Sequence, residues 1–247
     1  MRRQKNSLGS SSQKVGSSRL WNSKRVGDST ERKSALNLSG KMLILLAGEL
    51  SQFPIVPAAW DAIIAANGGA QHALAQGIIP DIVVGDFDSL AADEIDQLSL
   101  NTRLERVPHA QDFTDGEMAV HEALKRGAHK VVLAGGLGGR LDHTLANIFL
   151  LKHVQEAGAQ GWATDGHQRA FLLQNEVPVT LEGAPGDTVS IVPLSATVSG
   201  VHTMGLRWAL HDAELHFSSS LSISNEMNDV TAHIQAQKGT AVVLHMI

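Results

Sequence analysis

Between residues 42 and 165, short apolar segments alternate with amphipathic ones, and this alternation constrains the fold of the 247-residue chain more than any other feature. The apolar segments have the length of β-strands and lie at residues 42–47, 61–66, 81–84, 103–107, 130–134 and 160–164. The segments with helical character lie at residues 70–76, 91–98, 114–126 and 142–157. Strands that alternate with helices predict an α/β fold, with a mostly parallel sheet and helices on both faces.

Two of these helices have the clearest signals. Thr114 precedes Glu117 by three residues, which is the spacing of a capping box, and Gly127 marks the end of that helix. Its expected apolar side consists of Met118, Val120, Ala123 and Leu124. The second helix is expected to end before Gly158 and to bury a stripe formed by Leu145, Ile148, Phe149 and Leu151.

The pattern changes after about residue 165. Short apolar runs follow at residues 170–173, 177–181, 188–192, 213–217, 230–234 and 241–245, separated by Gly, Pro, Ser and Asn. This spacing is typical of an antiparallel sandwich or barrel. We therefore predict an α/β domain at residues 42–165, followed by a C-terminal antiparallel β-sandwich domain at residues 166–247.

Residues 1–41 differ from the rest in charge. They hold ten Lys or Arg and two acidic residues, a net charge of +8, whereas the remainder of the chain has a net charge of −13. The segment is rich in Ser and Gly, so we expect a disordered basic tail. It has three interpretations: an arm for nucleic acid or an anionic surface, a targeting presequence, or an upstream extension with Met42 near the folded start. The acidic remainder argues against nucleic acid as the main partner.

Composition excludes several kinds of site. The chain has no Cys, which rules out disulfides, zinc–thiolate centres and cysteine nucleophiles. The longest apolar runs are too short to span a bilayer, and the apolar segment of a signal peptide is missing. We therefore expect a cytoplasmic protein with no membrane partner.

Three polar clusters follow predicted strands or begin helices. Asp86 and Asp88 lie in Gly-Asp-Phe-Asp-Ser directly after the strand at residues 81–84, where two carboxylates can converge on a hard cation such as Mg²⁺. Gln111, Asp112 and Asp115 flank the start of a helix, where free backbone amides bind anions. Each cluster has a plain alternative, a solvated turn for the first and ordinary helix caps for the second.

The third cluster, Gly-Gly-Leu-Gly-Gly-Arg-Leu-Asp-His at residues 135–143, leads from a strand into a helix. Glycine turns let backbone amides approach phosphates, and Arg140 offers a planar fork to the same groups. Asp142 can ligate a metal, orient Arg140 or begin the helix, and the alternative is a tight turn with a salt bridge. Acids, an arginine and a glycine loop together suit phosphoryl transfer, although the P-loop and protein-kinase signatures are missing.

The order of these motifs resembles the thiamine pyrophosphokinase family. The motifs are N-G-G-A (67–70), P-D-I-V-V-G-D-F-D-S (80–89), Q-D-F-T-D-x-E (111–117), G-G-x-G-G-R-L-D-H-T-L-A-N (135–147), G-L-R-W (205–208) and S-I-S-N-E (222–226). The resemblance covers about residues 42–247. It implies an α/β catalytic domain, a β-sandwich domain, and a homodimer with a shared active site that converts thiamine and ATP, with Mg²⁺, into thiamine diphosphate and AMP.

The resemblance also implies roles for individual residues. The catalytic set would be Asp86, Asp88, Asp115, Arg140 and Asp142, of which the first three would hold Mg²⁺. The ATP and phosphate contacts would be Asn67, Gln111, Asp112, Thr114, Gly138, Gly139, Arg140 and His143. The thiamine contacts would be Ser222, Ser224 and Asn225, with Trp208 as either a packing or a stacking residue. Asp115 or Asp142 would accept the proton of the thiamine alcohol.

One residue departs from the family pattern, because Asn67 stands where the family usually has Asp. The amide leaves one negative charge fewer for Mg²⁺, but it still offers an oxygen to a metal or a hydrogen bond. Many relatives also have Lys in place of Gln111. Two other functions remain open: a haloacid-dehalogenase-type phosphatase with Asp86 as nucleophile, and a module that binds thiamine or nucleotide without turnover.

Overall fold

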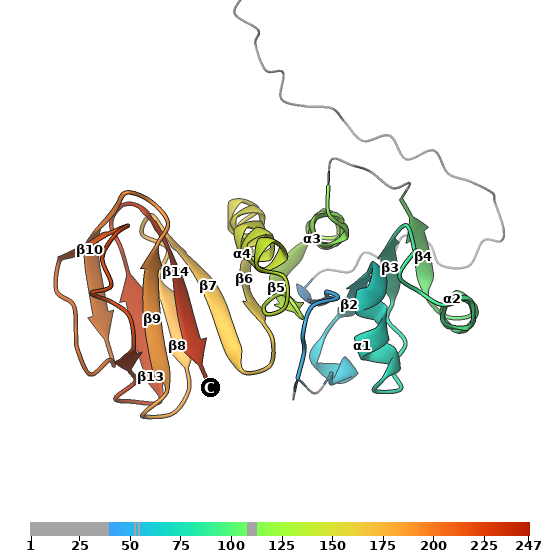
Figure 1. Ribbon diagram of the computed structural model, residues 1–247, viewed down its shortest axis with the longest axis horizontal. Coiled ribbons are helices and arrows are strands. Elements are labelled where there is room, and N and C mark those ends of the chain that lie inside the picture. Colours follow the sequence, from blue (N-terminus) through green and yellow to red (C-terminus); the bar gives the residue numbers. More distant parts are fainter. Residues whose placement is uncertain (1–39, 52, 54, 108–112) are drawn as a thin grey trace, which may run out of the picture. The chain divides into compact units, whose positions relative to one another are not determined.

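The computed structural model describes residues 40–51, 53, 55–107 and 113–247. Ten strands of this part form one sheet, in the order β12-β9-β14-β7-β6-β5-β1-β2-β3-β4, and β11-β10-β13-β8 form a second (Figure 1). The strands of the larger sheet are β1 (Gly40–Leu45), β2 (Ala62–Ala66), β3 (Ile82–Gly85), β4 (Arg103–Arg106), β5 (Ala128–Ala134), β6 (Gln160–Thr164), β7 (Gln168–Gln174), β9 (Thr188–Pro193), β12 (Asn225–Glu226) and β14 (Thr240–Met246). Those of the smaller are β8 (Val179–Glu182), β10 (Thr197–Met204), β11 (Ala213–His216) and β13 (Thr231–Gln235).

The strands from β6 to β4 run parallel, as the alternation of strands and helices predicts. β1 lies between β5 and β2, with Leu43 opposite Val132 on one side and Ile63 on the other. Because successive residues of a strand point to opposite faces, β1 supplies two cores at once. Ile44 packs into one hydrophobic cluster and Leu43 into another. A strand buried on both faces has to be apolar throughout, which explains the continuous run at the start of the domain.

Helices cover both faces of this parallel part (Figure 1). They are α1 (Ala70–Leu74), α2 (Ala92–Ser99), α3 (Asp115–Lys125) and α4 (Leu141–Glu156), together with the 3₁₀ turns η1 (Pro57–Ala59) and η2 (Asn67–Gly69). Buried side chains of α3 and α4 share a cluster with Ile44, and those of α1 and α2 share the other with Leu43. The prediction of an α/β fold with helices on both faces is confirmed.

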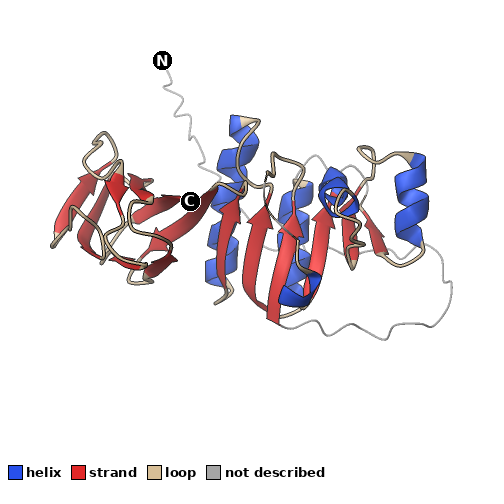
Figure 2. Cartoon of the chain, turned by 90° about the horizontal axis from the view of Figure 1, so that it is seen from below, coloured by secondary structure: helices blue, strands red, loops and turns tan. Residues whose placement is uncertain are grey.

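The C-terminal strands form the predicted antiparallel sandwich, and one of its two layers continues the α/β sheet. β7 pairs antiparallel with β6, and β14, β9 and β12 continue the same sheet (Figure 2). One layer of the sandwich is thus an extension of the α/β sheet, and the other is the smaller sheet packed over a third cluster. The turn between β6 and β7 is tight, because Asp165 Oδ1 accepts from the backbone N–H groups of His167 and Gln168, each at 2.8 Å.

Several element predictions need correction. Gly40 and Lys41 were assigned to the tail but belong to β1, and residues 1–39 lie outside the described part. β10 and the two-residue β12 were missed. The stripe expected on α4 is only half right, because Leu145 and Phe149 are 42% and 51% exposed while Ile148 and Leu151 are buried. On α3, Val120 and Ala123 are buried, and Met118 and Leu124 are packed against the same cluster as predicted.

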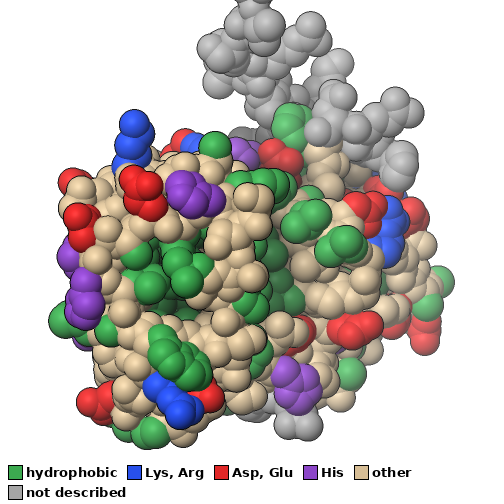
Figure 3. All heavy atoms as spheres, turned by 60° about the vertical axis from the view of Figure 1, so that its left-hand side comes forward, with side chains coloured by type: hydrophobic (Ala, Val, Ile, Leu, Met, Phe, Trp, Pro, Cys, Tyr) green, Lys and Arg blue, Asp and Glu red, His purple; other side chains and the backbone are tan. Residues whose placement is uncertain are grey.

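The surface is mixed in character. Figure 3 shows hydrophobic side chains at the surface of one face, interspersed with single charged and histidine side chains. Large exposed apolar side chains of the C-terminal strands and their loops include Met204, Trp208, Phe217, Leu221 and Val230. In the described ranges, no helix combines the length and the apolar character needed to cross a membrane.

Leu133 tests the importance of the central strands. Its side chain is fully buried on β5, between β1 and β6. We expect Leu133→Ala to lower the free energy of unfolding by about 3 kcal/mol, because it removes apolar contacts and leaves a cavity. Leu100→Ala is the matched control, since Leu100 is 79% exposed, and we expect a change below about 0.5 kcal/mol. Urea denaturation measures both, and equal effects would contradict this account of the core.

Candidate active site

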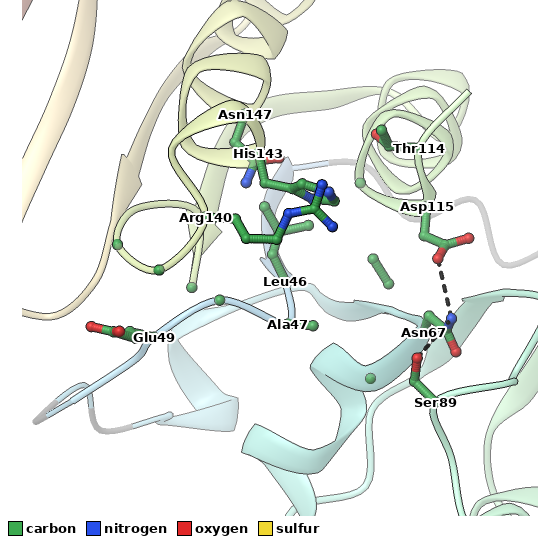
Figure 4. A pocket seen from close by; sticks show the side chains of 17 residues that line it. Leu46, Ala47, Glu49, Asn67, Ser89, Thr114, Asp115, Arg140, His143 and Asn147 are labelled. Atoms are coloured by element: carbon green, nitrogen blue, oxygen red, sulfur yellow. Dashed lines mark hydrogen bonds between the residues drawn. The ribbon is translucent and has the colours of Figure 1, made fainter. Parts of the chain in front are cut away.

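A cavity of about 420 Å³ lies at the carboxyl ends of the parallel strands (Figure 4). Its walls come from segments that follow β1, β2, β3 and β5 and from the first turns of α3 and α4. They comprise Leu46, Ala47, Gly48, Glu49, Ala66, Asn67, Gly68, Ser89, Thr114, Asp115, Gly116, Gly135, Gly138, Gly139, Arg140, His143 and Asn147. This is where ligands bind in open α/β sheets.

Asn67 lies where the acidic loops meet. Its Nδ2 donates to Asp86 Oδ1 at 3.0 Å and to Asp88 Oδ1 at 2.9 Å. The same nitrogen lies 3.2 Å from Asp115 Oδ2 and 3.4 Å from Ser89 Oγ. Carboxylates that are far apart in sequence therefore surround one amide nitrogen, as the positions of the motifs at one sheet edge led us to expect.

Backbone geometry makes this close approach possible. Asn67 has a φ of 45°, in the left-handed region that Asn tolerates better than most residues. Gly85, at the end of β3, has a φ of 148°. A Cβ on Gly85 would lie 3.0 Å from Asn67 Cβ and 3.2 Å from Asp115 Oδ1. Glycine at this position therefore leaves room for the amide and the carboxylate to meet.

Arg140 points into the cavity from the wall opposite Asn67 and Asp115 (Figure 4). It forms a two-pronged ion pair with Asp142, with Nη2 to Oδ2 at 2.6 Å and Nε to Oδ1 at 3.2 Å. Hydrogen bonding to Arg140 lowers the pKa of Asp142 to about 2, and the same pair raises the pKa of Arg140. Both side chains are exposed, so the arginine remains accessible to an anion.

The glycine turn between β5 and α4 is held from the helix side. Thr144 Oγ1 donates to the carbonyl of Gly138 at 3.0 Å, and Asn147 Nδ2 donates to the carbonyl of Gly136 at 3.1 Å. Gly138 has a φ of 80°, which a residue with a side chain rarely adopts. The turn is therefore a fixed feature of the cavity wall, with small residues that permit close approach of a ligand.

The donor set suits a hard cation. Carboxylate oxygens are the ligands that Mg²⁺ prefers, and a buried oxygen, Asn67 Oδ1, has no hydrogen-bond partner beside them. The carboxylates lie at hydrogen-bond distance from the amide nitrogen, longer than the roughly 2.1 Å of Mg²⁺ coordination. Accordingly, the described residues contain no group of three or more His, Asp or Glu side chains already arranged around a metal position.

Most predicted residues of the ATP side meet around this cavity. Asn67, Thr114, Asp115, Gly138, Gly139, Arg140 and His143 line it. Asp86 and Asp88 do not line the cavity, but both accept hydrogen bonds from Asn67, which does. Asp142 likewise pairs with Arg140, which lines the cavity. Gln111 and Asp112 lie outside the described residues.

The predicted thiamine residues gather elsewhere, around β12. Asn225 binds the backbone of Trp208 twice, accepting from its N–H at 3.1 Å and donating to its carbonyl at 2.8 Å. Ser222 Oγ donates to the carbonyl of Ile191 at 2.6 Å, and the backbone N–H of Ser224 donates to Ser190 Oγ at 3.0 Å. None of the four predicted residues lines the described cavity.

Sequence reasoning missed three parts of the cavity wall. The loop at Ala47, Gly48 and Glu49 follows β1, and its position after a strand of the parallel sheet is a signal that went unused. Ser89 and Asn147 stand at the ends of motifs that were recognised without these residues being assigned a role. For Asn147, the contact with the glycine turn depends on helix geometry across eleven residues.

Comparison with known proteins gives one family throughout. The family model for the thiamin pyrophosphokinase catalytic domain matches residues 57–161, and that for the thiamin pyrophosphokinase vitamin B1 binding domain matches residues 174–241. Thiamine pyrophosphokinase of Bacillus subtilis is 27% identical over 192 residues, which cover 73% of this chain and 85% of that protein. Thiamine pyrophosphokinase 1 of Arabidopsis thaliana is 25% identical, over 59% of this chain and 58% of that protein's length.

Solved structures agree. The crystal structure of a thiamin pyrophosphokinase family protein from Enterococcus faecalis superposes with a TM-score of 0.73 at 26% identity, covering 84% of this chain and 99% of that one. The Bacillus subtilis structure gives a TM-score of 0.74 at 23% identity, covering 83% and 98%. This second likeness concerns the fold. The chain matches less than two thirds of the Arabidopsis relative, whereas it matches nearly all of both bacterial structures.

Thr114 tests how the start of α3 is held. Its Oγ1 accepts from the backbone N–H of Glu117 at 3.1 Å and caps the helix that carries Asp115. We expect Thr114→Ala to lower the free energy of unfolding by about 1 kcal/mol, because the amide loses its partner. Thr114→Ser keeps the hydroxyl, so its free energy of unfolding should differ from that of wild type by no more than about 0.3 kcal/mol. Urea denaturation of the three proteins checks this, and equal losses in both variants would remove the capping role.

Proposed function

The chain belongs to the thiamine pyrophosphokinase family, and we propose that it transfers a pyrophosphoryl group from ATP to the alcohol of thiamine, giving thiamine diphosphate and AMP. The observation that carries this proposal is the meeting of Asp86, Asp88 and Asp115 around Asn67, a residue that lines the same cavity as Arg140. This arrangement offers acids for a cation and a guanidinium for phosphate at one sheet edge.

We assign the binding of Mg²⁺ to Asp86, Asp88 and Asp115. One oxygen of each carboxylate lies 2.9–3.2 Å from the same atom, Asn67 Nδ2, so the three side chains converge where they could hold a cation. When bound, Mg²⁺ neutralises phosphate oxygens and lowers the cost of bringing a triphosphate beside the acids. The backbone around Asn67 and Gly85 fixes the loops from which these side chains project.

The ATP phosphates would lie against the glycine turn and Arg140. The amides of the turn and the start of α4 favour negative charge, and the guanidinium offers parallel N–H groups to phosphate oxygens. The hydroxyl oxygen of thiamine bonds to the β-phosphorus, the bond from that phosphorus to the α–β bridging oxygen breaks, and AMP leaves with that oxygen. Alignment of the two reactants and stabilisation of charge supply most of the rate enhancement.

The proton of the thiamine hydroxyl needs an acceptor. The pair with Arg140 lowers the pKa of Asp142 to about 2, which makes Asp142 a weak base at neutral pH. Asp115 lies across the cavity, and its Oδ2 contacts the Asn67 amide. Of the two acids considered for this step, we therefore assign the proton to Asp115.

We further propose that two copies of the chain share each active site. Ser222, Ser224, Asn225 and Trp208 cluster around β12, apart from the residues that line the cavity. A site that holds both substrates then takes its thiamine residues from a second chain. The proposal divides the chain into a catalytic domain at residues 42–165 and a thiamine-binding domain at residues 166–247, with a cytoplasmic location as a prediction from the sequence.

Asp86 and Asp88 test the metal assignment. We expect Asp86→Asn or Asp88→Asn to lower the rate of AMP and thiamine diphosphate formation by more than about 100-fold, because each removes a charged metal ligand. Asp96→Asn on the exposed surface of α2 makes the same chemical change away from the site and should act like wild type. Activity within about tenfold of wild type in the first two variants contradicts the assignment. Thiamine binding without AMP formation in the wild type would favour a non-catalytic module.

Mixed dimers test the shared site. Asp86→Asn and Asn225→Ala should each be inactive alone, because they damage opposite halves of the site. After the two are unfolded together and refolded, one intact site forms in each mixed dimer, so activity returns to about a quarter of wild type. No recovery in a mixture shown to contain mixed dimers would place both halves within one chain.

A further inference from the structure

We propose that the side chain of Asn67 has two working orientations. In the metal-free protein its amide nitrogen takes the place of a cation between Asp86, Asp88 and Asp115. When Mg²⁺ enters, the amide turns over and presents its oxygen to the metal. This inference rests on the proposed metal role of these acids, but its first half concerns the metal-free protein alone.

The first argument is the position of the nitrogen. Nδ2 lies 2.9–3.2 Å from one oxygen of each of the three carboxylates. Carboxylates so close together repel one another unless positive charge lies between them. The two N–H groups of the amide carry partial positive charge and serve this purpose without a full charge. An Asp at this position would add a fourth carboxylate where Asn67 supplies a donor to the other three.

The second argument is the oxygen at the other end of the amide. Asn67 is only 6% exposed, and its Oδ1 is buried with no hydrogen-bond partner. Leaving such an oxygen unpaired is costly, and native structures rarely do so without a reason. Rotation by half a turn about the last side-chain bond exchanges the nitrogen and the oxygen. The oxygen then faces the point between the carboxylates, where it is a suitable ligand only if a cation is present.

The third argument is that the rest of the residue has little freedom to move. Asn67 begins η2 with a φ of 45° and is only 6% exposed, so neighbouring atoms enclose its side chain. Movement of the whole side chain out of the site would disturb this packing. Rotation of the terminal amide keeps the same volume, and such rotations have broad minima.

Together these points predict that Asn67 makes the metal-free protein more stable and lowers its affinity for Mg²⁺. The Asn holds the acids together without metal, but its nitrogen has to leave their centre before Mg²⁺ can bind. An Asp would bind Mg²⁺ more tightly, because it adds a charge to the ligand set. It would also make the metal-free protein less stable, because the three acids would lose the amide donor that Asn67 supplies.

Asn67→Asp tests this inference in the full-length protein without either substrate. In EDTA at pH 7.5, we expect its Tm to be lower than that of wild type by roughly 4 °C or more. Titration with MgCl₂ should raise its Tm more than that of wild type, with a Kd for Mg²⁺ roughly tenfold lower by calorimetry. Asn101→Asp is the control, because it makes the same change on the exposed segment after α2 and should follow wild type in both measurements.

A second measurement uses the wild type and does not depend on the variant folding. The side-chain NH₂ signal of Asn67 is assigned in ¹H–¹⁵N spectra of the wild type by selective labelling. We expect Mg²⁺ to shift this pair and to speed its exchange with water, because the hydrogen bonds to the acids are lost. An unchanged NH₂ signal at saturating Mg²⁺ overturns the two orientations.

The remaining outcomes separate this inference from the proposed function. If wild type and Asn67→Asp have the same Tm in EDTA and bind Mg²⁺ equally, the inference is wrong and the metal site stands. If neither protein binds Mg²⁺ even with ATP present, the metal assignment fails and the two orientations fail with it.

Discussion

Like charges that converge in one place need a compensating group, and this requirement governs the side chains at the carboxyl ends of the parallel strands. Two loops and the start of a helix bring Asp86, Asp88 and Asp115 within hydrogen-bond distance of a single amide nitrogen. The parallel order of β1, β2 and β3 makes the convergence possible, because the carboxyl ends of these strands lie at one edge. The apolar strands below are buried on both faces, so the acids stand on a rigid base.

The same sheet connects the chemistry to the second half of the chain. β6 pairs with β7 through the hairpin at Asp165, and the strands beyond extend the sheet as one layer of the sandwich. A hairpin of this kind fixes the register of its strands, since Trp162 stands opposite Phe171 and their rings stack at 5.8 Å. The residues around β12 are therefore carried by the backbone that carries the cavity, although they do not line it.

The sequence was sufficient for the elements whose physical signals are local. Strand-length apolar runs, the Thr114 cap and the glycine turn predicted the parallel sheet, α3 and the cavity wall between β5 and α4. The extension of the sheet beyond β7 could not be predicted, because it depends on pairing between β7 and β14, about 70 residues apart. The burial of α4 was half wrong for a similar reason. Leu145 and Phe149 fit the helical period, but the buried side of α4 is the one that carries Ile148, Leu151 and Val154.

In the candidate site, too, some features could be predicted from the sequence and others could not. Motif positions predicted which loops meet, and the cavity lining agrees for the Asn67, Asp115 and Arg140 segments. What the sequence could not supply is the direction of each side chain. At Asn67 the sequence predicts one negative charge fewer and an amide oxygen for a metal or a hydrogen bond, but it does not show that the amide nitrogen faces the acids. In the folded protein the amide nitrogen of Asn67 is a hydrogen-bond donor among carboxylate oxygens. The residue that lacks the negative charge of an Asp therefore also supplies the donor that holds the three acids together.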